Sequence, residues 1–168
     1  MKFKFIFIWT SLFLSVILSG CSASKGLTKE EKLAKEAELL EALEKRTFIV
    51  EVDRVFPTNG NPQALTSTYS LAINGDEVKS YLPFFGRAYS LPYGGGEGLI
   101  FESTLTDYQS VFDNKGKATI TFKTKSKDDQ FNYRIQIYPN GTASIDVTSV
   151  NRQKISFNGK ASAKKMKK

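Results

Sequence analysis

From residue 47 onward, apolar and polar residues alternate along the chain with a period of two. Such alternation is typical of strands that bury one face and expose the other. Asn-Gly and other turn-forming steps interrupt the pattern at short, regular intervals. The pattern predicts strands over residues 48–53, 69–73, 77–82, 99–101, 108–112, 118–123, 131–137, 143–147 and 155–157.

The connections between these segments are short, apart from the one that contains residues 83–98. Asn74-Gly75 has the signature of a two-residue hairpin turn, and the last strand is predicted to end before Asn158-Gly159. Neighbours in sequence should therefore be neighbours in an antiparallel meander. We predict an all-β domain over residues 47–160 that closes into a small lipocalin-like barrel, because closure removes exposed edges. A two-sheet sandwich is the alternative.

Ahead of the strands, residues 28–46 have a helical pattern. Thr28 and Glu31 have the spacing of a capping box, which predicts that a helix begins there. Its charges include Glu–Lys pairs four residues apart, and its predicted apolar stripe is narrow. The stripe consists of Leu33, Ala37, Leu40 and Leu43, with Leu39 beside it. We expect a charged amphipathic helix that docks on the domain by one face, since two heptads are too few to indicate a coiled coil.

The first 20 residues resemble a lipoprotein signal peptide. Lys2 and Lys4 precede an apolar run of 14 residues, 5–18, which is shorter than the roughly 20 needed to span a bilayer. Leu18-Ser19-Gly20-Cys21 resembles a lipobox, in which the cysteine becomes the acylated N-terminal residue. Residues 21–27 would then be a lipidated tether that fixes the protein to a membrane through Cys21. No acidic residue follows the cysteine, which favours the periplasmic face of the outer membrane of the cell envelope.

The net charge of +7 is concentrated at the two ends of the chain. Seven of the 24 basic residues lie within residues 1–4 and 160–168, and the 17 others balance the 17 acidic residues. The body therefore has no basic groove for a phosphate backbone, and we expect no nucleic-acid partner. The basic tail, residues 161–168, is either a solvated end or an additional contact with an anionic surface.

Residue types that usually carry catalysis are scarce. The chain has no histidine, and its single cysteine is assigned to the lipid, so we expect no catalytic residues, no metal and no cofactor. Asp128 and Asp129 are interpreted as part of a solvated loop. Glu97 and Glu102 only suggest a carboxylate pair. A hydrolase built from carboxylate, tyrosine and lysine is the remaining enzymatic alternative.

The segment 80–102 has the most unusual composition, because aromatic residues stand among prolines and glycines. Its candidate binding residues are Tyr81, Phe84, Phe85, Arg87, Tyr89 and Tyr93. In one hypothesis they line a binding module for a small apolar or aromatic ligand or for a segment of an envelope protein. In the other they fill the end of the barrel, and the protein is a structural or inhibitor-like envelope protein that acts by protein contact.

Several of these motifs occur together in a known family. The lipobox, the run Tyr-Leu-Pro-Phe-Phe-Gly-Arg-Ala-Tyr at 81–89, the glycines at 94–98 and the closing residues 151–159 resemble a family of predicted bacterial lipoproteins that is catalogued as a domain of unknown function and is common in Bacteroidota. The resemblance covers roughly residues 30–160. It implies a barrel-like domain in the cell envelope and supplies no catalytic residues.

Overall fold

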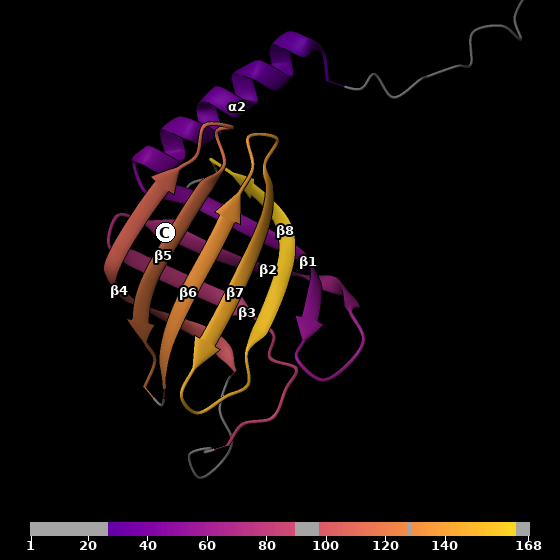
Figure 1. The fold of residues 1–168 in the computed structure, drawn as a ribbon, viewed down its shortest axis with the longest axis vertical. Coiled ribbons are helices and arrows are strands. Elements are labelled where there is room, and N and C mark those ends of the chain that lie inside the picture. Colours follow the sequence, from indigo (N-terminus) through magenta and orange to yellow (C-terminus); the bar gives the residue numbers. More distant parts are fainter. Residues whose placement is uncertain (1–26, 90–97, 128, 164–168) are drawn as a thin grey trace, which may run out of the picture.

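The protein folds into a closed antiparallel barrel of eight strands in sequence order, with β1 and β8 joined at the seam (Figure 1). The structure is a computed structural model and describes residues 27–89, 98–127 and 129–163. It confirms the predicted barrel and not the sandwich. The strands are β1 (Thr47–Pro57), β2 (Gln63–Asn74), β3 (Glu77–Leu82), β4 (Leu99–Phe112), β5 (Ala118–Lys125), β6 (Gln130–Ile137), β7 (Thr142–Ser149) and β8 (Ile155–Ser162).

The helix α2 (Lys29–Glu44) begins with the predicted capping box. The Glu31 amide donates to the Thr28 hydroxyl at 3.2 Å, and the Thr28 amide donates to the Glu31 carboxylate at 2.8 Å. The predicted stripe is confirmed at Leu43 and the adjacent Leu39, but it is wrong at Leu33 and Leu40, which are 56% and 44% exposed. The helix buries Leu39, Ala42 and Leu43, because only its C-terminal half lies on the barrel end (Figure 1).

Side chains fill the described interior of the barrel. Inward residues of all eight strands belong to one apolar core, which contains several stacked aromatic rings. The rings of Phe122 and Tyr133 lie 4.9 Å apart, and the Tyr133 hydroxyl lies 3.1 Å from that of Ser80. Burial raises the pKa of the Tyr133 phenol, because removal from water disfavours its charged form. The barrel is thus a packed core like that of other small barrels.

β1 and β2 are longer than predicted, and two predicted strands form one strand in the structure. The segments 99–101 and 108–112 belong to the single strand β4, which bends at a bulge between Thr106 and Gln109 where Asp107 has φ 55°. Its first half pairs with β3 and its second half with β5. The bulge breaks the alternation, and for that reason the sequence pattern looked like two strands.

The predicted end of the last strand before Asn158-Gly159 is wrong, because β8 continues through both residues to Ser162. Gly159 pairs with Val52 of β1, next to a bulge in that strand. Ala161, which the sequence placed in the basic tail, is buried, and its amide donates to the Gly141 carbonyl at 2.7 Å. The barrel therefore extends two residues beyond the predicted boundary at 160.

The strand directions give the barrel two unlike ends. At the helix end lie α2, the start of β1, the turns β2–β3, β4–β5 and β6–β7, and the end of β8 (Figure 1). At the far end lie the connections β1–β2, β3–β4, β5–β6 and β7–β8. The unusual aromatic segment belongs to the β3–β4 connection and so to the far end.

Candidate functional site

The segment after β3 is fastened to the β7–β8 connection at the far end. The Tyr89 amide donates to the Asn151 carbonyl at 2.8 Å, and the Gln153 amide donates to the Arg87 carbonyl at 3.1 Å. Between these two bonds, Ala88 and Arg152 form an isolated antiparallel bridge. Two connections that are distant in the sequence therefore hold each other in place.

Phe84 closes the far end of the core. Its half-buried ring packs on the core, and the Arg152 guanidinium carbon lies 5.2 Å from the ring centre. The residues around Phe84 leave about 0 Å³ for a water-sized molecule. They are Leu99, Phe131, Val147, Ser149, Arg152, Gln153 and Ile155. Phe84 thus has the capping role that the second sequence hypothesis gives to the aromatics.

An ion pair is buried beside Phe84. Arg152 Nε lies 3.4 Å from Asp129 Oδ2, and the two side chains are only 6% and 2% exposed. Asp129 Oδ1 accepts hydrogen bonds from the Gln130 amide at 2.8 Å and the Asn151 side chain at 3.3 Å. The interpretation of Asp129 as a solvated loop residue is wrong, because Arg152 reaches it from the β7–β8 connection. Asp128 lies outside the described residues.

Four other predicted residues face solvent. Tyr81, Phe85 and Tyr89 are 44%, 39% and 66% exposed, and Arg87 is also exposed. They are not part of the core, in contrast to Phe84. Tyr93 lies outside the described residues.

The structure adds two residues that the sequence did not single out. The Tyr69 ring stacks on Tyr81, with 5.4 Å between ring centres. Ile100 is the cross-strand partner of Tyr81 and is exposed. Tyr69 shares the face of the inward residues Leu71 and Ile73 and packs partly against the core, and only the β2–β3 register, a long-range property, brings it close to Tyr81. We call Tyr69, Tyr81, Phe85, Tyr89 and Ile100 the far-end aromatic surface.

The acidic candidates do not form a carboxylate pair in the described part of the chain. Glu102 forms an ion pair with Lys79 on the outside of the barrel, and Glu97 lies outside the described residues. Across the residues that the structure places, no group of three or more potential metal ligands occurs. No described helix is long and apolar enough to cross a membrane.

An open polar hollow of about 570 Å³ lies on the outside of β4 to β7. Its charges are paired, with Lys123 2.8 Å from Asp107 and Lys154 3.0 Å from Asp146. Partial burial opposes ionisation of Asp146, but hydrogen bonds from Ser156 and Lys154 outweigh it and lower the pKa. A lowered pKa is opposite to what a general acid near neutral pH requires. The hollow therefore offers no evident acid–base arrangement.

Comparisons with known proteins identify the domain but not its activity. The family model described as "Domain of unknown function (DUF4251)" matches residues 30–161. A crystal structure of a DUF4251 family protein from Bacteroides eggerthii has a TM-score of 0.60 and 17% sequence identity, with 77% of this chain and 87% of that chain covered. At this identity the likeness shows the fold alone. No curated protein matches the sequence.

Proposed function

Because the chain belongs to the DUF4251 family, whose function is unknown, we propose a role from the site itself: a lipid-anchored envelope protein that binds a protein partner without catalysis. The anchor is Cys21, which follows Leu18-Ser19-Gly20 as in a lipobox. The absence of acidic residues directly after Cys21 favours the periplasmic face of the outer membrane. Acyl chains there would hold the protein at the membrane while the barrel stays in water.

The observation that carries the proposal is the contrast between a filled interior and an exposed far end. Phe84 completes the core, whereas Tyr81, on β3, and Phe85 and Tyr89, on the connection bonded to residues 151 and 153, are exposed. A small apolar ligand would need an internal cavity, and the described core leaves little space for one. Exposed aromatics on a fixed backbone are typical of protein interfaces, because they give contact area at a low entropic cost.

Partner binding at this surface unites the two sequence hypotheses. The candidate residues Tyr81, Phe85, Arg87 and Tyr89 would contact a segment of another envelope protein, and Phe84 would support them from below. The Arg87 guanidinium supplies five donors for carbonyl or carboxylate groups of that segment. Among the described residues, no arrangement of carboxylate, tyrosine and lysine side chains supports the alternative of a hydrolase.

Site-specific photocrosslinking in intact cells tests the proposal. We expect a photoreactive residue in place of Tyr89 to give an adduct of discrete mass with another protein, and Tyr81→Ala to reduce the yield about tenfold, which corresponds to 1.4 kcal/mol of binding free energy. The matched control is Tyr138, which is also exposed but lies at the helix end. Equal yields of protein adducts at positions 89 and 138, or no effect of Tyr81→Ala, would contradict the proposal.

A further inference from the structure

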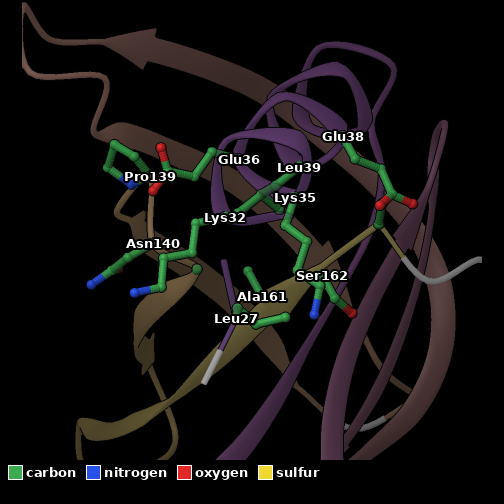
Figure 2. Close-up of a pocket in the computed structure, with 12 residues that line it drawn as sticks. Leu27, Lys32, Lys35, Glu36, Glu38, Leu39, Pro139, Asn140, Ala161 and Ser162 are labelled. Carbon is green, nitrogen blue, oxygen red and sulfur yellow. The ribbon is translucent and has the colours of Figure 1, made fainter. Parts of the chain in front are cut away.

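Both ends of the described chain leave the barrel from the same place. Leu27 and Ala163 line one cavity of about 520 Å³ beneath the N-terminal half of α2. Figure 2 shows Lys32 and Lys35 extending from α2 into the space in front of Ala161 and Ser162. The tether to Cys21 and the tail with its four lysines at 164, 165, 167 and 168 are therefore attached to the same side of the helix end.

The helix end also exposes apolar side chains to solvent. Leu27, Leu33, Leu40 and Tyr138 are 44–56% exposed. A second, smaller hollow of about 220 Å³ lies between α2 and the turns β4–β5 and β6–β7. Its lining is mainly apolar and includes Leu40, Leu43, Ile137, Tyr138 and Pro139. Apolar side chains that gather on one exposed surface often mark a site of interaction with a protein or a membrane.

The length of the tether keeps this end close to any membrane that holds Cys21. Leu27 lies six positions after Cys21. Even fully extended, this stretch spans only about 20 Å, at ~3.3–3.6 Å per residue. The exposed leucines of α2 are therefore held near the bilayer surface at a high effective concentration.

From these observations, and resting on the proposed anchor at Cys21, we propose that the helix end is a membrane-docking face seated on an anionic phospholipid bilayer. Leu27, Leu33 and Leu40 enter the headgroup region, and Tyr138 takes the interfacial position that tyrosine favours. The acyl chains on Cys21 hold the protein at the membrane, and this face fixes the orientation of the barrel on it.

The distribution of charge indicates that the tail provides the electrostatic attraction to the membrane. Helix α2 carries three lysines and six glutamates, so the helix alone is not attracted to an anionic surface. The four lysines at 164–168 contain no acidic neighbour and follow directly from Ala163 at the rim of the cavity. Lysines close to anionic headgroups add attraction that falls with ionic strength.

This orientation gives the far-end aromatic surface a defined direction. The far end and the helix end lie at opposite ends of the barrel (Figure 1). With the helix end on the bilayer, Tyr81, Phe85 and Tyr89 point away from the membrane into the surrounding compartment. A partner segment can then reach them without competing with lipid.

Tryptophan fluorescence tests the docking face on the intact lipidated protein. The only tryptophan, Trp9, lies in the predicted signal peptide, so the mature chain has none and an introduced tryptophan reports on one position. The variants are Leu33→Trp, with Leu40→Trp as a second probe, and Val150→Trp as a control that is 82% exposed on the β7–β8 connection. Each is reconstituted into vesicles of phosphatidylglycerol and phosphatidylethanolamine with brominated acyl chains.

We expect a blue shift and at least about twofold quenching for the tryptophans at 33 and 40, and neither change at 150, because bromine quenches only at short range within the bilayer. Changing all four tail lysines to glutamine should weaken the quenching and remove its dependence on salt. An acylated protein in which positions 33 and 40 behave like 150 would overturn the docking face alone. An intact mass without acyl chains on Cys21 would overturn the anchor, and the inference with it.

Discussion

Replacing Gly159 with alanine is expected to lower the free energy of unfolding by about 4 kcal/mol or more, one of the largest effects a single substitution can have. A Cβ atom at this position would lie 2.0 Å from the Glu51 carbonyl oxygen and 2.7 Å from Val52 Cα. Both are backbone atoms of β1, so no side-chain rotation can relieve the clash. The substitution would push β8 from β1 and open the seam that closes the barrel.

Gly75→Ala is the matched control for this prediction. Gly75 lies in the β2–β3 turn with φ +65°, and a Cβ there would meet no atom within 4 Å. Only the strain of a left-handed residue remains, which costs roughly 1–2 kcal/mol. Urea denaturation followed by circular dichroism measures both losses. If Gly159→Ala lowers the free energy of unfolding no more than Gly75→Ala does, β1 and β8 can move apart at the seam more easily than their backbone contacts imply.

Removing the carboxylate of Asp129 is expected to cost about 3–5 kcal/mol, because Asp129→Leu leaves the Arg152 guanidinium buried without its partner. The effect should reach the far-end aromatic surface as well. Arg152 lies over Phe84 and bridges Ala88, so an unpaired charge would loosen the segment that carries Phe85 and Tyr89.

The double variant Asp129→Leu/Arg152→Met separates the ion pair from simple packing. Replacing both charges by apolar groups removes the unpaired charge and should recover most of the lost stability. A double-mutant cycle in urea gives the coupling energy between the two residues. If the double variant loses the sum of the two single losses, the residues contribute independently and the ion pair does not hold the far end together.

The barrel was predictable because each strand buries one face. The alternation of apolar and polar residues, with Phe131 and Tyr133 at apolar positions, shows directly which face is buried. The start of α2 was also predictable from local sequence, because Thr28 and Glu31 form their capping box within one turn. The prediction at Asn158-Gly159 failed because the preference of Asn-Gly for turns is a local property. The close contact with β1 that requires glycine at position 159 involves a strand about 100 residues away.

The candidate site was less predictable for the same physical reason. Phe84 and Phe85 are neighbours with the same chemistry, yet one packs in the core and the other faces solvent. The difference depends on the β7–β8 connection, which brings Arg152 over Phe84 and fixes the backbone at Ala88. No periodicity within residues 81–89 contains this information, and the sequence therefore left both hypotheses open.

The central claim is that this barrel acts through its outside and encloses no ligand. Native mass spectrometry of the mature protein, purified in mild detergent from its own membranes, tests this claim most directly. The account predicts the mass of the acylated chain with no retained small molecule, for the wild type and for Phe84→Ala alike. A small molecule that stays bound to the wild type and is lost from Phe84→Ala would contradict it.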